Sequence, residues 1–129
     1  MRTIKFRGKR VDNGEWVYGD LLRIHGVLYI YPDPAPNGWN DYEVIPDTVG
    51  QFTGLHDVYG KEIYEGDVVD FVAYDAFGNE RGNEQGVVRF TFCAYQIGGY
   101  DMYDVLLNDD CAEVIGNIHD NPELLKSND

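Results

Sequence analysis

The sequence has few cysteines, few basic residues and no long apolar segment. Its two cysteines, Cys93 and Cys111, form no Cys-x-x-Cys pair, which favours buried free thiols in a reducing compartment over a disulfide framework. No apolar run approaches the roughly 20 residues that cross a bilayer. The charged N-terminus also lacks the apolar segment of a secretory signal. We therefore expect a cytoplasmic protein that does not enter a membrane.

Catalytic and metal-binding patterns are missing as well. No serine lies in a Gly-x-Ser-x-Gly elbow, no glycine-rich segment continues into a phosphate-binding loop, and the three histidines lack ligand spacing. Acidic pairs such as Asp101 with Asp104 are expected by chance among 23 acidic residues. The sequence therefore predicts no catalytic, cofactor-binding or metal-binding residues and no cofactor. We expect a protein that is not an enzyme.

Charge is distributed unevenly along the chain. The formal net charge is −13, from 23 acidic and 10 basic residues. Half of the basic residues lie in the first ten positions, which contain no acid. The remaining chain is strongly acidic and repels phosphate at long range, which disfavours general nucleic-acid binding. An acidic body suits a solvated surface or a basic partner.

The first 31 residues alternate between apolar and polar positions, as half-buried strands do. The expected strands are residues 3–7, 15–22 and 27–31. The pair Asn13-Gly14 is typical of a tight hairpin turn between the first two. Ile4 and Phe6 are expected to face the core, with the basic residues on the other face. The sequence therefore predicts an N-terminal β-meander.

A proline-rich loop follows the meander. Residues 32–41 contain three of the five prolines, which excludes a helix or a central strand. Trp39 is the one large apolar residue of this loop. It either packs against the core or forms a binding contact, so it is a candidate interaction residue.

Short strand patterns separated by turn residues continue after the loop. The expected strands are 42–45, 48–55, 67–74, 86–93, 94–98, 102–107 and 113–118. The Glu-Gly-Asp turn at residues 65–67 and the strands that follow predict a small SH3-like β-barrel. Residues 75–86 are expected to form a flexible hairpin loop. Asn121 and Pro122 are typical of the start of one short C-terminal helical turn.

The fold class expected from these patterns is mainly β with minor α. We expect a single domain over residues 1–129. It would consist of an N-terminal β-meander lobe (1–60) and a barrel-like lobe (61–125).

Several segments together carry a family resemblance. They are residues 4–9, 14–20, 49–55, 60–69, 114–118 and 121–125. Their order and spacing resemble the YopX family, small proteins typical of bacteriophages and prophages, and the Ile-Tyr-Glu-Gly-Asp segment at 63–67 is the most specific. The likeness is weakest over the proline-rich loop and residues 73–112. It implies a bacterial or phage cytoplasm and a mainly β fold with a small barrel. It supplies no established activity and no catalytic residues.

The basic first strand supplies the remaining candidate interaction residues, Lys5, Arg7 and Lys9. They either neutralise the acidic body of the same molecule or a twin subunit, or contact a phosphate backbone. The favoured hypothesis is a phage or prophage accessory protein that acts as a non-catalytic protein-interaction module with an unknown protein partner, including as a homo-oligomer. The alternative is nucleic-acid binding through the first strand. An uncharacterised enzyme is the third class.

Overall fold

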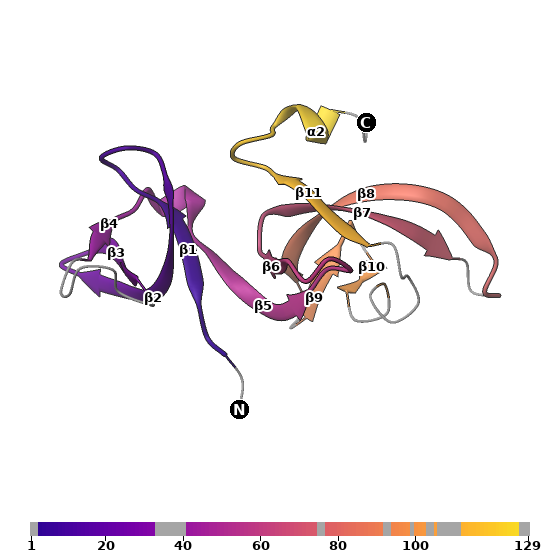
Figure 1. Cartoon of the computed structure of the whole chain (residues 1–129), viewed down its shortest axis with the longest axis horizontal. Helices are drawn as coiled ribbons and strands as arrows, with labels where there is room; N and C mark the ends of the chain where they lie inside the picture. The colour runs from indigo at the N-terminus through magenta and orange to yellow at the C-terminus, as the bar shows by residue number, and fades with distance from the viewer. Residues whose placement is uncertain are drawn as a thin grey trace. The chain divides into compact units, whose positions relative to one another are not determined.

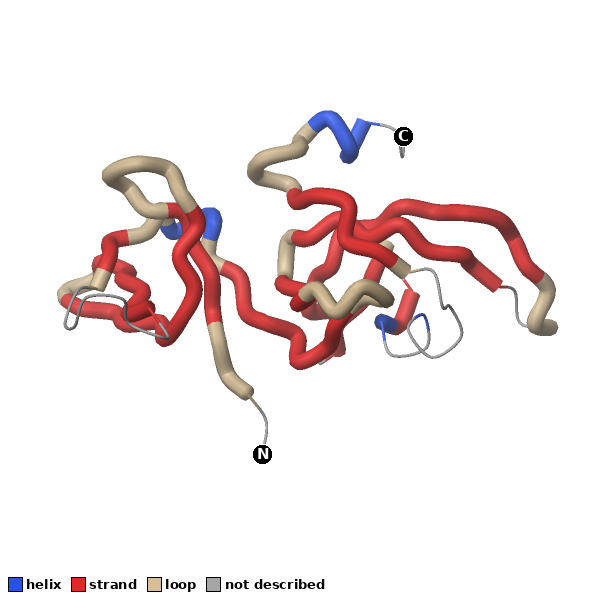
Figure 2. Tube along the Cα trace, viewed as in Figure 1, coloured by secondary structure: helices blue, strands red, loops and turns tan. Residues whose placement is uncertain are grey.

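The computed structural model describes residues 3–32, 41–74, 77–91, 94–98, 100–102, 105 and 112–126. The chain forms two compact units, residues 1–54 and 55–129, and each has its own hydrophobic core. Strands make up most of both units (Figures 1 and 2). The mainly β fold class predicted from the sequence is confirmed. No helix in the described parts of the chain is long and apolar enough to span a membrane.

The first unit is an antiparallel sheet with strand order β4-β3-β2-β1-β5. Its elements are β1 (Phe6–Lys9), β2 (Trp16–Ile24), β3 (Val27–Pro32), β4 (Tyr42–Glu43), the 3-10 helix η1 (Pro46–Thr48) and β5 (Gly50–His56). The predicted meander is confirmed as β1, β2 and β3, since each pairs with the next. The turn between β1 and β2 contains Gly14 at a φ of 73°, a left-handed conformation that glycine adopts without steric cost.

One face of this sheet carries the core of the first unit. Val17, Ile30 and Val44 are buried there, and Phe6 packs against them. Gly8 belongs to the same face, because a Cβ at this position would lie 3.0 Å from Cβ of Val44. The predicted orientation of Phe6 is confirmed. The burial expected for the Ile4 side chain is wrong: it is 63% exposed, because it precedes the paired residues of β1.

The second unit contains a five-stranded antiparallel sheet of order β10-β9-β8-β7-β11. Its elements are β6 (Glu62–Tyr64), β7 (Asp67–Tyr74), β8 (Glu80–Thr91), β9 (Ala94–Ile97), β10 (Tyr100–Asp101), β11 (Glu113–Asn117) and the helical turn α2 (Glu123–Lys126). β6 pairs with the end of β5, which carries the chain into this unit. The short C-terminal helical turn predicted after Asn121 is confirmed as α2.

The core of the second unit is larger than that of the first. Its buried side chains include Ile63, Val69, Phe71, Val88 and Ile97. From Val69 to Tyr74 on β7, buried residues alternate with more exposed ones, as the period of two of a strand requires.

The loop from residue 57 to 61 is attached to β11 through one buried carboxylate. Asp57 is 7% exposed. Its Oδ1 accepts hydrogen bonds from the amides of Tyr59 and Lys61, both at 2.9 Å. Its Oδ2 accepts one from the amide of Val114 at 3.0 Å. A single side chain therefore forms the turn locally and connects it to a strand far along the sequence.

The Glu-Gly-Asp turn before β7 is held by its own residues. Gly66 has a φ of 89°, in the left-handed region. The Oδ2 atom of the buried Asp67 accepts a hydrogen bond from the amide of Tyr64 at 2.8 Å. The turn is therefore stabilised by its own backbone and side chain.

Three details of the second unit differ from the sequence prediction. Among the described residues, no pairing joins β10 to β11, so the predicted barrel is an open sheet. The outer side of β11 is instead hydrogen-bonded to the loop at Asp57 and Val58, whose amide reaches the carbonyl of Ala112. Residues 80–86 of the predicted loop belong to β8. In the predicted strand 102–107, Met102 and Val105 are helical and buried.

Candidate functional site

Three basic residues, two in β1 and one just before it, lie on the face of the first sheet opposite the core of Val17, Ile30 and Val44. In the antiparallel register, Arg7 pairs with Tyr18 and Lys9 with Trp16 on β2. On the other side, the carbonyl of Lys5 accepts a hydrogen bond from the amide of Phe52 on β5 at 2.8 Å. Directly paired residues project to the same face of a sheet. Lys5, Arg7 and Lys9, here called the basic strip, therefore share their face with aromatic side chains from both neighbouring strands.

Each cation of the basic strip lies over an aromatic ring. The guanidinium carbon of Arg7 is 4.6 Å from the ring centroid of Trp16, and Nζ of Lys9 is 5.6 Å from the same ring. Nζ of Lys5 is 5.9 Å from the centroid of Phe52. These distances are within the roughly 6 Å over which the electron-rich face of a ring attracts a cation. The rings hold the basic side chains against the sheet.

The three cations differ in exposure. Arg7 is only 5% exposed, whereas Lys5 and Lys9 are half-buried. A guanidinium is planar and weakly hydrated, so it tolerates burial against a Trp ring better than an ammonium group does. Lys5 and Lys9 are therefore the more exposed members of the strip, and Arg7 is the most buried.

The backbone of the basic strip is fixed near Lys9 by η1. Oγ1 of the buried Thr48 accepts a hydrogen bond from the amide of Lys9 at 2.9 Å and donates one to the carbonyl of Ile45 at 2.6 Å. The amide of Ile45 in turn donates to the carbonyl of Lys9 at 2.8 Å. The strip is thus part of a rigid sheet with neighbours on both sides, rather than a flexible terminal arm.

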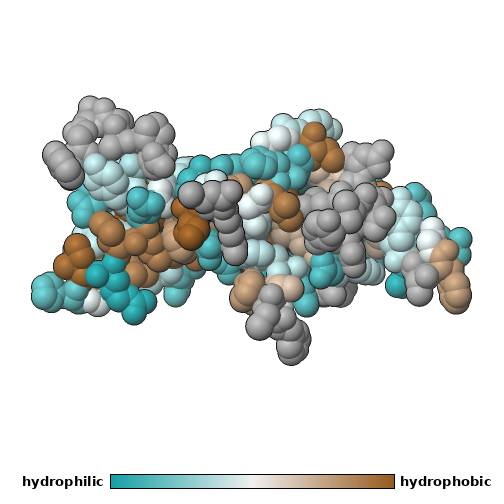
Figure 3. All heavy atoms as spheres, turned by 90° about the horizontal axis from the view of Figure 1, so that it is seen from below, coloured by the Kyte–Doolittle hydropathy of each residue, from teal (hydrophilic) through white to brown (hydrophobic). Residues whose placement is uncertain are grey.

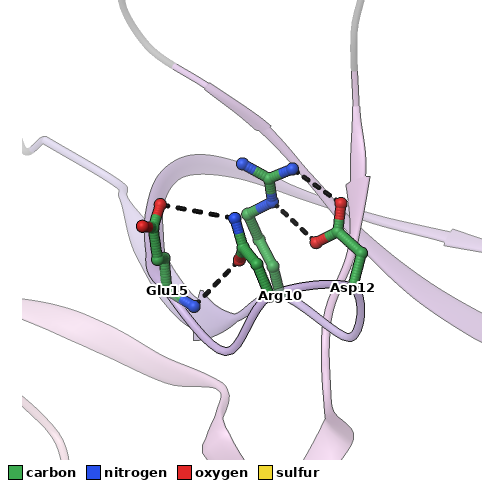
Figure 4. Close-up of polar contacts among 4 residues, drawn as sticks. Arg10, Asp12 and Glu15 are labelled. Carbon is green, nitrogen blue, oxygen red and sulfur yellow. Dashed lines mark hydrogen bonds and ion pairs between the residues drawn. The ribbon is translucent and has the colours of Figure 1, made fainter.

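Arg10, which follows the strip, is paired within the molecule (Figure 4). Its Nε and terminal nitrogen donate to the two carboxylate oxygens of Asp12 at 2.9 and 2.7 Å. The hydrogen bond to Asp12 raises the pKa of Arg10, and the same bond lowers the pKa of Asp12. The guanidinium also lies 3.9 Å from the ring centroid of Tyr42. A bidentate pair of this kind neutralises Arg10 locally.

A shallow hollow of about 230 Å³ lies beside this pair, between the β1–β2 turn and β4. It is lined by Val11, Asp12, Asp41, Tyr42 and Glu43. Its charged lining is acidic, so its chemistry is opposite to that of the basic strip.

The remaining sequence candidates are not assembled into a site by the described residues. No group of three or more His, Cys, Asp and Glu side chains in this part of the chain is placed to hold a metal ion. His25 is exposed in the turn after β2. Trp39 and both cysteines lie outside the described residues. The candidate site is therefore the basic strip together with Trp16 and Phe52.

Sequence reasoning found the three cations but not the two rings below them. Trp16 and Phe52 belong to different strands, and only the pairing of β1 with both β2 and β5 places them beside the strip. The available signal was the alternation in β2, which puts Trp16 and Tyr18 on one face. This alternation places the two rings beside the cations only when the strands that pair with residues 3–9 are known.

Comparisons with known proteins agree with the family resemblance. The chain belongs to the YopX family: the sequence profile described as "YopX protein" matches residues 5–126. A solved structure described as "protein EF1440 from Enterococcus faecalis" is 24% identical, with a TM-score of 0.57. The match covers 97% of this chain and 99% of that one. This likeness concerns the fold alone. No curated protein matches.

Proposed function

We propose that this YopX-family protein is a phage- or prophage-derived accessory protein that acts without catalysis, by binding another protein in the cytoplasm of a bacterial host. The observation that carries the proposal is the basic strip with its aromatic neighbours, on the face of the first sheet opposite the core of Val17, Ile30 and Val44. Arg, Trp and Tyr are the residue types that most often dominate the energy of protein interfaces. Here the half-buried Trp16 and the exposed Tyr18 lie on β2, directly opposite Lys9 and the buried Arg7.

The rigidity of the strip supports binding by a preformed surface. Side chains that are already held in place lose less conformational entropy when a partner arrives. Lys5 and Lys9 are positioned by rings, and the backbone of Lys9 is hydrogen-bonded to Thr48. The half-exposed Tyr18 adds amphipathic contact area beside them.

Nucleic-acid binding is the second candidate, and one feature favours it. Cations interleaved with aromatic rings also suit a single-stranded nucleic acid, whose bases stack and whose phosphates attract lysine. Against it stand the net charge of −13 and the burial of Arg7, which keeps one of the three cations from a phosphate. The strip therefore supports a protein partner better.

An affinity experiment tests the proposed function. Tagged protein is incubated with a nuclease-treated bacterial lysate, bound proteins are identified, and each is purified for calorimetric titration. A Lys5→Gln/Lys9→Gln variant should lose about tenfold or more in affinity, the effect of removing roughly 1.4 kcal/mol. An Arg23→Gln/Arg81→Gln variant is the matched control, since it removes two exposed positive charges away from the strip.

Arg23 makes this control stringent, because it lies on β2 but faces the other way, paired with Leu28 of the core face. Equal loss of affinity in both variants would mean that net charge, not the strip, governs binding. A partner recovered only from lysate without nuclease treatment would favour the nucleic-acid alternative. The proposal is refuted if every purified partner binds the strip variant as tightly as it binds the unmodified chain.

A further inference from the structure

The β2–β3 hairpin carries an apolar surface that stays partly open to solvent. Leu22 on β2 lies directly opposite Tyr29 on β3. Ile24, two positions further along β2, lies opposite Val27. Directly paired residues project to the same face of a sheet, and so do residues two apart on one strand. Leu22 is 38% and Ile24 45% exposed, and their two partners are half-buried. These four residues are here called the hairpin face.

The hairpin face is separate from the core of the first unit. The intervening side chains of Leu21 and Leu28 project to the other side of the hairpin, where they pack against the core. Hydrophobic side chains gather at the surface of the first unit in Figure 3. Apolar residues that remain exposed as a group, with polar residues around them, mark interaction sites, whereas single exposed ones do not.

The hairpin face is also preformed. Its turn consists of His25 at a φ of 52° and Gly26 at 80°, the left-handed pair that matches the twist of the two strands. Side chains held by such a hairpin lose little conformational entropy when a partner binds. The exposed Asp20 on β2 and Glu43 on β4 border the face. It therefore has the apolar centre and polar rim of an interface.

The distribution of charge between the two units indicates what can cover this face. Residues 1–54 contain 6 basic and 7 acidic side chains, whereas residues 55–129 contain 4 basic and 16 acidic ones. Two copies that met through their second units would repel each other, but two first units meet with almost no net repulsion. The hairpin face itself contains no charged side chain, so a charged partner gains no ion pair within it. A near-neutral apolar surface is the suitable occupant, and the chain itself provides one.

From these observations we infer that the hairpin face packs against the same face of a second copy of this chain, in a two-fold symmetric dimer. In such a dimer one surface meets itself, so each apolar residue of the face finds an apolar neighbour. Two sheet faces pack about 10 Å apart through interdigitating side chains. The inference goes beyond the proposed function, and none of the four residues belongs to the basic strip.

Sedimentation velocity of the full chain over a wide range of concentrations tests this inference. We expect the unmodified chain to show a monomer–dimer equilibrium. Leu22→Thr/Ile24→Thr should raise the dissociation constant of the dimer by about tenfold or more, because a two-fold contact loses each apolar side chain twice. Threonine is common in strands, so the hairpin should keep its pairing.

Two variants serve as matched controls. Val58→Thr/Tyr59→Thr removes two exposed apolar side chains from the second unit. Arg23→Thr changes the residue between Leu22 and Ile24, whose side chain projects to the other side of the hairpin. Both controls should dimerise like the unmodified chain. Circular dichroism and thermal unfolding establish that each variant is folded, and if the double hairpin variant is not, Ile24→Thr alone decides.

The effect of salt distinguishes this apolar contact from an electrostatic one. Added sodium chloride screens the repulsion between the acidic second units, so dimerisation through the hairpin face should stay constant or strengthen. A dimer that joins the basic strip of one copy to the acidic second unit of the other would instead dissociate as the salt concentration rises. It would also be weakened by Lys5→Gln/Lys9→Gln, which should leave a hairpin-face dimer intact.

Three outcomes would overturn the inference: a chain that is monomeric at every concentration, a dimer that Leu22→Thr/Ile24→Thr does not weaken, or a dimer that dissociates as salt is added. Failure of the inference is distinguishable from failure of the proposed function. A monomer that still requires Lys5 and Lys9 to bind a purified protein would leave the proposed function standing. A hairpin-face dimer whose strip variant binds every purified partner as tightly as the unmodified chain would refute the proposed function alone.

Discussion

Replacing Asp57 by asparagine should destabilise the second unit strongly, although it removes no atoms from the core. The two carboxylate oxygens of Asp57 accept three backbone hydrogen bonds, from Tyr59, Lys61 and Val114. An asparagine oxygen can keep the two local bonds, but its NH2 group then faces the amide of Val114, donor against donor. A buried donor left without an acceptor costs roughly 1–3 kcal/mol. We expect Asp57→Asn to lower the free energy of unfolding by about 2 kcal/mol and Asp57→Ala by about 4 kcal/mol.

The effect should depend on pH in a specific direction. Burial alone would raise the pKa of Asp57 and is the largest single influence, but the hydrogen bonds from the amides of Val114, Lys61 and Tyr59, with the charge of Lys61, together lower it. A lowered pKa in the folded state adds stability above the unfolded pKa. That stability is lost as the pH falls below about 4. The difference between the unmodified chain and Asp57→Asn should therefore shrink as the solution is acidified.

Hydrogen exchange resolved by residue is the appropriate assay, because it reports the stability of the second unit separately. The amide of Val114 and its neighbours on β7 should exchange faster in Asp57→Asn by a factor corresponding to about 2 kcal/mol, or roughly 30-fold. Asp101→Asn removes an exposed carboxylate from β10 and is the control. Unchanged protection of Val114 in Asp57→Asn, or a difference that stays constant down to pH 3, would refute this account of the turn.

Three further substitutions test the packing of the strands. Gly8→Ala should destabilise the first unit by about 1–3 kcal/mol in urea unfolding, since the new Cβ would lie 3.0 Å from Cβ of Val44. Adding Val44→Ala to this variant should recover part of the lost stability. Asp70→Lys should stabilise the second unit by roughly 0.2–1 kcal/mol in thermal unfolding, because Asp70 lies directly opposite Glu113 and like charges there repel. Destabilisation would contradict this register. Trp16→Ala should destabilise the first unit more than Trp16→Phe does, because only phenylalanine retains a ring below the basic strip; equal losses would show that the ring is irrelevant.

The sequence was most informative where alternation is strict. The pattern of residues 3–7 correctly separated Phe6 from the cations, because a period of two fixes the face of a strand once it is paired. Local turn chemistry was equally reliable, as Gly14 at a φ of 73° in the predicted turn between β1 and β2 shows. These features depend only on neighbouring residues.

Features that depend on pairing between distant strands were not predictable. Residues 80–86 are rich in polar residues and glycine, which is typical of a loop, yet they pair with β7. The register shifts between Ala73 and Tyr74, near Gly82 at a φ of 106°, so this glycine serves a bulge within a hairpin. The burial of Arg7 also required knowledge of both neighbours of β1. Alternation of apolar and polar residues predicts where strands occur, but it does not predict which strands pair with one another.

The central claim is that the basic strip is the binding surface for a protein, and chemical-shift mapping tests it most directly. A ¹⁵N-labelled chain would be titrated with a purified partner identified by the affinity experiment. The account predicts that the largest changes occur at the amides of β1 and the indole N–H of Trp16, and that Lys5→Gln/Lys9→Gln abolishes them. Changes confined to residues 55–129, with β1 and Trp16 unaffected, would contradict it.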